Sequence, residues 1–144
     1  MMKIIAFVIL FIAGTNQTAR AICVKAKEAN LRQGPGTQYE KVWKVYKYMP
    51  FRTLSRSGDW VQVRDVDGGT QWIHKSLVTN DYLCVVVKVK KVNLRSGPGT
   101  NFSKVVKAYR LDVFKFIKQE GQWINVMDVH GDTFWIFRNL VWVN

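Results

Sequence analysis

The sequence contains few of the residues from which enzymes usually build catalytic centres. Its 144 residues include two cysteines, two histidines and ten acidic side chains. Neither His74 nor His130 stands in a metal-binding pattern such as His-Glu-x-x-His, and neither cysteine stands in a glycine-rich catalytic turn. Any two acids could form a glycosidase pair, but no pair is singled out by its context. We therefore predict that the protein is not an enzyme and uses no metal and no cofactor.

The sequence also lacks an apolar run long enough to cross a bilayer. Its N-terminal run, residues 4–14, has about 11 residues, whereas a transmembrane helix needs about 20. The run follows a positive start at Lys3 and precedes a small-x-small sequence that ends at Ala21, which is typical of a cleaved signal peptide. An uncleaved anchor is the alternative. We expect residues 1–21 to be removed and the protein to be periplasmic or extracellular.

Acidic residues are outnumbered by basic ones, 10 to 22, which gives a formal net charge of +12. Removal of residues 1–21 takes away Lys3 and Arg20 and no acid, so the charge of the mature chain is +10. A field of this strength favours anionic partners such as nucleic acids, lipid headgroups or acidic cell-wall polymers. Export removes most nucleic acid from this set, so no nucleic-acid partner is expected. The alternative is that the charge serves only solubility.

An internal repeat covers nearly all of the mature chain. An offset of 63 residues aligns positions 22–81 with positions 85–144 without a gap, and 26 of the 60 aligned positions are identical. Such a repeat predicts two copies of one small structural module. We predict a signal peptide at residues 1–21, module 1 at residues 22–81 and module 2 at residues 82–144. The repeated motifs include Asn30-Leu31-Arg32 with Asn93-Leu94-Arg95, and Gly34-Pro35-Gly36-Thr37 with Gly97-Pro98-Gly99-Thr100.

Short strands and turns are the expected elements of each module, because no stretch keeps a helical apolar period. Residues 60–66 and 70–74 predict a hairpin. A three-residue loop at 67–69 places Arg64 opposite Trp72 and Gln62 opposite His74, and it puts the aliphatic side chains on one face. A two-residue loop would scatter them. The expected core side chains are Val61, Val63 and Ile73, with Ile124, Val126 and Ile136 in module 2; the expected outer side chains are Trp60, Trp72, Trp123 and Trp135.

Taken together, the motifs resemble the bacterial SH3-like (SH3b) domain family. The shared features are Asn-Leu-Arg-x-Gly-Pro-Gly-Thr, a Gly-x-Trp strand, an Asp-x-x-Gly turn and a Trp-Ile strand, and residues 60–65 and 72–77 resemble exported members from Gram-negative bacteria. The resemblance implies an all-β fold of two tandem small SH3-like β-barrels, with a short helical turn near Ser76-Leu77 and Asn139-Leu140. Gln71 and Phe134 stand where the family usually has glycine.

Aromatic side chains are the expected ligand contacts, because flat rings stack against peptide groups and sugar rings. The alternative for each tryptophan is that it covers the thin core of a small barrel. Arg32 and Arg95 are expected to hold the Gly-Pro-Gly turns, and Asp65 and Asp128 the hairpin turns. The candidate ligand-binding residues are Tyr39, Trp43, Tyr46, Trp60 and Trp72 in module 1, and Phe102, Tyr109, Trp123 and Trp135 in module 2.

The resemblance implies a non-catalytic function, the recognition of peptidoglycan, its stem peptides or another anionic cell-envelope polymer. Charge, export and aromatic content all permit this function. Two modules on one chain would raise avidity for a polymer. The alternative is an adaptor that binds an extended peptide of another envelope or host protein.

Cys23 and Cys84 have two interpretations. In a barrel of the implied kind the last strand pairs with the first, so the stretch after Leu77 should run beside the stretch that begins at Cys23. Export makes a disulfide chemically accessible, and two buried free thiols are the alternative. We predict the disulfide. Neither cysteine has a cysteine at the equivalent position of the other copy, so the bridge is not intrinsic to the module.

We predict that the mature protein begins at Ile22, because the small-x-small sequence ends at Ala21. Intact-mass spectrometry of the exported protein should give the mass of residues 22–144. A membrane-bound species that keeps residues 1–21 would contradict the signal peptide.

Overall fold

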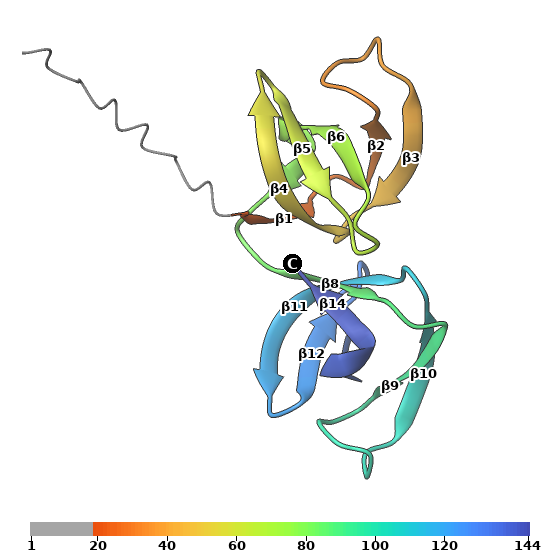
Figure 1. Cartoon of the computed structure of the whole chain (residues 1–144). Coiled ribbons are helices and arrows are strands. Elements are labelled where there is room, and N and C mark those ends of the chain that lie inside the picture. Colours follow the sequence, from red (N-terminus) through yellow and green to blue (C-terminus); the bar gives the residue numbers. More distant parts are fainter. Residues whose placement is uncertain (1–18) are drawn as a thin grey trace, which may run out of the picture.

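The computed structural model describes residues 19–144, so residues 1–18 of the expected signal peptide lie outside the described part. The described residues form fourteen strands and two short 3-10 turns, arranged as two seven-stranded sheets (Figure 1). Within this range no helix is long and apolar enough to cross a membrane. The prediction of an all-β fold with two small tandem barrels is confirmed.

The first sheet forms module 1 and has the strand order β3-β2-β6-β5-β4-β1-β7. The final strand pairs with the first, with Thr79 opposite Cys23, as the barrel closure predicted. A 3-10 turn at Lys75–Leu77 leads into that final strand. The strands are β1 (Ala21–Val24), β2 (Glu28–Arg32), β3 (Lys41–Tyr46), β4 (Pro50–Ser57), β5 (Trp60–Arg64), β6 (Thr70–His74) and β7 (Val78–Thr79).

The second sheet forms module 2 and repeats this order as β10-β9-β13-β12-β11-β8-β14. Its 3-10 turn, Arg138–Leu140, stands where the repeat requires it. At one end of each sheet, strand β3 or β10 pairs with a single neighbour, so the barrel is partly open along that strand. The strands are β8 (Cys84–Val87), β9 (Lys91–Arg95), β10 (Lys104–Tyr109), β11 (Val113–Glu120), β12 (Trp123–Met127), β13 (Thr133–Phe137) and β14 (Val141–Val143).

The hairpin of β5 and β6 sorts its side chains into two faces as predicted. Val61, Val63 and Ile73 are buried in the core of module 1, and the equivalent aliphatic residues are buried in module 2. Trp60 and Trp72 lie on the other face, because successive side chains of a strand alternate between faces.

The predicted register of this hairpin is wrong by two residues. Trp72 lies opposite Gln62 rather than Arg64, and Arg64 lies opposite Thr70. The loop therefore has five residues, 65–69, because the Asp65 carboxylate accepts hydrogen bonds from the backbone N–H groups of Asp67 and Gly69, both at 2.9 Å. A two-residue shift leaves every side chain on its predicted face. Asp128 holds the equivalent turn of module 2 in the same way, as expected.

Strand β8 joins the two modules, because it is buried on both faces. Val85 and Val87 belong to the core of module 2, whereas Val86 belongs to the core of module 1. Trp142 of β14 and Val113 of β11 also pack against the module 1 core. Figure 1 shows β8 and β14 at the boundary between the two modules. The modules therefore pack against each other through apolar contacts and are not separate domains joined by a flexible linker.

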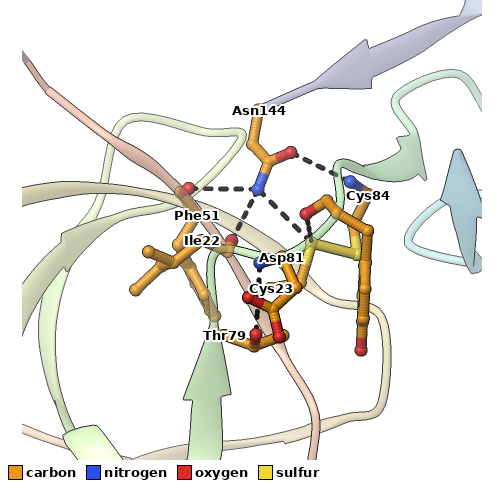
Figure 2. Close-up of a disulfide and its surroundings, with 8 residues drawn as sticks. Ile22, Cys23, Phe51, Thr79, Asp81, Cys84 and Asn144 are labelled. Atoms are coloured by element: carbon orange, nitrogen blue, oxygen red, sulfur yellow. Dashed lines mark hydrogen bonds between the residues drawn. A yellow bond between two sulfur atoms is a disulfide. The ribbon is translucent and has the colours of Figure 1, made fainter.

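A disulfide and the C-terminal residue reinforce this junction. Cys23 of β1 and Cys84 of β8 form a disulfide, as predicted, and both are fully buried. The Asn144 amide donates to the carbonyl oxygens of Ile22 (2.5 Å) and Phe51 (3.3 Å), and its oxygen accepts from the Cys84 N–H (2.9 Å; Figure 2). One side chain of module 2 thus satisfies two backbone carbonyls of module 1.

We predict that removing the disulfide lowers the free energy of unfolding by about 4 kcal/mol, since the cross-link closes a long loop in the unfolded chain. A Cys23→Ala/Cys84→Ala variant should unfold at a lower urea concentration than the oxidised protein and at nearly the same concentration as the reduced wild type. Unfolding of the variant together with the oxidised wild type would contradict this assignment.

Candidate ligand-binding surface

A row of side chains on the face opposite the core crosses each sheet at the same place. In module 1 the row runs through Ser55, Gln62, Trp72 and Arg32 on neighbouring strands. The equivalent positions of module 2 form a corresponding row, which consists of Lys118, Asn125, Trp135 and Arg95.

An aromatic pair lies beside each row. Trp60 packs edge-on against His74, with ring centroids 5.3 Å apart and planes at 89°. Trp123 packs against Phe137 at 5.5 Å. Edge-on and tilted pairs are favourable arrangements of aromatic rings. We call each row together with its pair the outer aromatic face: Arg32, Ser55, Trp60, Gln62, Trp72 and His74 in module 1, and Arg95, Lys118, Trp123, Asn125, Trp135 and Phe137 in module 2.

The arginine at the end of each row holds the neighbouring turn. Arg95 Nη1 donates to the carbonyl oxygens of Thr100 (3.1 Å) and Phe102 (2.9 Å). Arg32 makes the same two bonds to Thr37 and Tyr39, both at 2.9 Å. The expected role of both arginines at the Gly-Pro-Gly turns is confirmed, so each turn is fixed relative to its tryptophan row.

Glycine is required in these turns because an aromatic ring lies against the backbone. A Cβ atom on Gly34 would overlap the ring of Tyr39, and a Cβ atom on Gly97 would overlap the ring of Phe102. Tyr39 and Phe102 therefore pack over their turns, although each ring keeps about two-fifths of its surface exposed (42% and 40%).

The outer aromatic face of module 2 borders a hollow of about 470 Å³. Trp123 and Phe137 line one part of it, and the turn at 99–101 lines another. Arg95 stands between the turn and the tryptophan row, where it both holds the turn and lines the hollow. The remaining lining comes from Val92, Asn93 and Leu140.

The row of module 2 is more basic than the row of module 1. The Lys118 ammonium lies 5.5 Å from the centroid of the Trp135 ring, and Arg95 lies opposite Trp135 on the other side. Module 1 has Ser55 at the position of Lys118. Lys118 also pairs with Glu120 at 3.3 Å, but both groups are exposed, so solvent screens that pair. A ring flanked by two cations can stack on a flat group while the cations attract a carboxylate.

Several predicted ligand contacts lie elsewhere. Trp43 is opposite Leu31 on the inner face of β3 and packs against the core, so its inclusion in an outer groove is wrong. Tyr46 and Tyr109 are exposed, but they stand at the other end of β3 and β10 from the row. Trp60, Trp72, Trp123 and Trp135 do share outer faces.

His74, Phe137 and Lys118 belong to these faces and were absent from the predicted set. His74 and Phe137 could have been found from the sequence, because each stands two residues after a row tryptophan and shares its face. Lys118 could not, because β11 contains a register irregularity between Phe116 and Lys118 that changes which side chains point outward.

The arrangement offers no evident nucleophile among the described residues. Both cysteines form the disulfide. His74 Nδ1 lies 2.7 Å from Ser76 Oγ, but the same nitrogen also faces the Ser76 N–H at 3.2 Å, so the ring caps the 3-10 turn. Within residues 19–144 no cluster of three or more His, Cys, Asp or Glu side chains could hold a metal ion.

The fold and the outer aromatic faces define a tandem pair of small β-barrel modules. The family model described as bacterial SH3 domain matches residues 25–80 and 88–142, one match in each module. The chain belongs to the bacterial SH3 domain family, which confirms the resemblance inferred from the sequence.

A curated relative is similar over most of the chain. It is "Putative N-acetylmuramoyl-L-alanine amidase YrvJ" of Bacillus subtilis (strain 168), 27% identical over 128 residues, which cover 82% of this chain and 24% of the relative. The chain therefore spans about a quarter of the length of the relative it matches.

Solved structures with low sequence identity also align. The chain named "Endolysin LysPBC5 CBD" is 18% identical, with a TM-score of 0.36, and the alignment covers 88% of this chain and 94% of that one. NlpC1 from Trichomonas vaginalis is 12% identical, with a TM-score of 0.40, covering 90% of this chain and 47% of that one.

We predict that Arg95→Met loosens the turn at 96–102, because two carbonyl oxygens lose a charged donor; hydrogen bonds of this kind contribute about 1.5–3 kcal/mol. Amide hydrogen exchange should quicken in that turn, and the melting temperature should fall. Lys104→Met is the matched control, because it removes the same charge from the residue opposite Arg95 on β10. Equal effects of the two substitutions would contradict the role of Arg95.

Proposed function

We propose that this chain is an exported, non-catalytic binding protein that recognises peptidoglycan, its stem peptides or another anionic polymer of the cell envelope. The observation that carries the proposal is the outer aromatic face of module 2, where Trp135 lies between Lys118 and Arg95. The other two rings of this face, Trp123 and Phe137, line a hollow of about 470 Å³ together with Arg95. Aromatic rings supply contact area for sugars and peptide groups, and the cations attract carboxylates.

The bacterial SH3 family and the curated relative support a cell-wall ligand. The name of the relative refers to the N-acetylmuramoyl-L-alanine linkage, and this chain matches about a quarter of that protein. A binding segment and a catalytic segment can occupy different parts of one long chain, and function has to be argued from the site. In our proposal the two modules supply the binding part of such a system without its chemistry.

The distribution of polar groups supports binding rather than hydrolysis. The acids Asp65 and Asp128 are occupied in holding hairpin turns. His74 is occupied as a turn cap. These groups would have to leave structural hydrogen bonds before they could act as general acids or bases.

The net charge supports an electrostatic contribution to affinity. Because the formal charge is +12, or +10 after removal of residues 1–21, an anionic polymer is attracted before any specific contact forms. The fully buried disulfide is consistent with an oxidising compartment, and this supports the proposed periplasmic or extracellular location.

We predict that Trp135→Ala weakens binding to purified sacculi by about five-fold, the equivalent of one lost aromatic contact of roughly 1 kcal/mol. Trp72→Ala should weaken it as well. Co-sedimentation measures the bound fraction, and circular dichroism verifies that each variant is folded. Tyr109→Ala is the matched control, because it removes an exposed ring outside the outer aromatic face.

The same sacculi test the other parts of the proposal. Binding should weaken from low to physiological salt, as the screening length shortens to about 8 Å, and no soluble muropeptides should be released. Failure to sediment at low salt, together with specific retention of an envelope protein, would favour the peptide-binding adaptor. Release of muropeptides would overturn the non-catalytic assignment.

A further inference from the structure

A second and larger hollow lies at the open end of the module 2 barrel. Its volume is about 740 Å³, and it lies between the end strand β10, the start of β11 and the turn that joins β12 to β13. Leu94, Ala108 and Phe114 form a buried apolar floor, and Phe134 adds a partly buried wall. We call this hollow the barrel mouth of module 2. It is separate from the outer aromatic face, whose tryptophans do not line it.

The internal repeat shows which side chains open this hollow. The 63-residue offset aligns Val106 with Trp43 and Ala108 with Val45. Both Val106 and Trp43 lie opposite the equivalent leucine of the neighbouring strand, Leu94 or Leu31, so they point the same way. In module 1 the large Trp43 ring packs against the core, whereas in module 2 Val106 is 47% exposed. Module 2 has therefore lost bulk at the two positions that face the mouth.

The same comparison shows a gain of negative charge at the rim. Asp112 stands where module 1 has Met49, and Asp132 stands where it has Gly69. The third rim carboxylate, Asp128, is present in both copies as Asp128 and Asp65. The lining contains these three carboxylates and one ammonium, Lys107, so its formal charge is −2 in a chain of charge +12.

Each rim carboxylate keeps an oxygen that is not used by the fold. In module 1 the Asp65 carboxylate is fully engaged, because Oδ1 accepts from two backbone N–H groups and Oδ2 accepts from Gln71 Nε2. In module 2 Phe134 replaces Gln71, so among residues 19–144 no hydrogen bond reaches Asp128 Oδ2. Asp112 uses Oδ2 to accept from the Tyr109 N–H at 2.7 Å, which leaves Oδ1.

We propose that the barrel mouth of module 2 binds an alkylammonium group, such as the side chain of a lysine residue in a peptide. The apolar floor suits the methylene stem, and the three carboxylates suit the terminal charge, because long basic side chains bury their stems and keep the charged end at a polar rim. The remainder of the surface is strongly basic and repels cations, which directs such a group to this place.

The probe for this site is Nα-acetyl-lysine N-methylamide, with Nα-acetyl-norleucine N-methylamide as its uncharged counterpart. Titration into the full chain, followed by amide chemical shifts, should give saturable shifts at Ala108, Asp112 and Thr133 with the lysine compound alone. Equal shifts with the norleucine compound, or no saturable shifts, would overturn the proposal. The probe contains no cell-wall material, so its result is independent of sacculus binding.

Substitutions test the assignment to this hollow. Val106→Trp gives module 2 the side chain of module 1 and should abolish the shifts. Asp132→Asn should weaken binding by up to about five-fold. Asp81→Asn removes an equal charge from the loop between β7 and β8 and should leave binding unchanged. Asp132 is exposed, so its variant keeps the test decisive if Val106→Trp fails to fold. Undiminished binding by folded Val106→Trp, or equal effects of the two asparagine variants, would show that the group binds elsewhere.

Discussion

The burial of β8 on both faces is the constraint on which the arrangement of the molecule depends. A strand at the surface of a small barrel normally turns one face to solvent and reads as an alternation of apolar and polar residues. Cys84 to Val87 has no such alternation, because Val85 and Val87 fill the core of module 2 while Val86 fills the core of module 1. The disulfide and the Asn144 amide bonds add further links between the two modules at this junction.

The repeat made much of the fold predictable, because each motif occurs in both copies and an interpretation of one copy could be checked against the other. It predicted two copies of one module and supported the core and outer faces of the hairpin, and the resemblance to the SH3-like family implied the two barrels. The turns held by Arg32 and Arg95 were also expected from the sequence. It did not predict the loop length, because the sequence does not show that Asp65 closes the turn across five residues. Trp43 was misplaced because an aromatic on a short strand fits either face until its partner, Leu31, is known. The contact between the two modules was not predicted, although the apolar run at residues 84–87 has no polar face and could have indicated it.

The two copies have diverged mainly in what they expose. The core positions that decide the fold remain aliphatic in both modules. The outer positions have changed chemistry: Ser55 corresponds to Lys118, and His74 corresponds to Phe137. Module 2 has become more basic on its outer aromatic face and more acidic at its barrel mouth, so opposite charges occupy different sides of one small domain. Two chemically distinct surfaces can coexist there because the sheet between them keeps its apolar interior.

Rigid coupling of the modules changes what a tandem pair can gain from a polymer. A flexible linker lets two sites engage repeats at many spacings, and the effective concentration of the second site falls as the linker lengthens. Here the burial of β8 against both cores, the disulfide and Asn144 restrict how the two outer aromatic faces can move relative to each other. The conformational entropy that would be lost in positioning the second face is therefore lost during folding rather than during binding. If the proposed function holds, this coupling predicts selectivity: a polymer whose repeat matches the spacing of the two faces would gain avidity from both, whereas a polymer with another spacing would engage a single face.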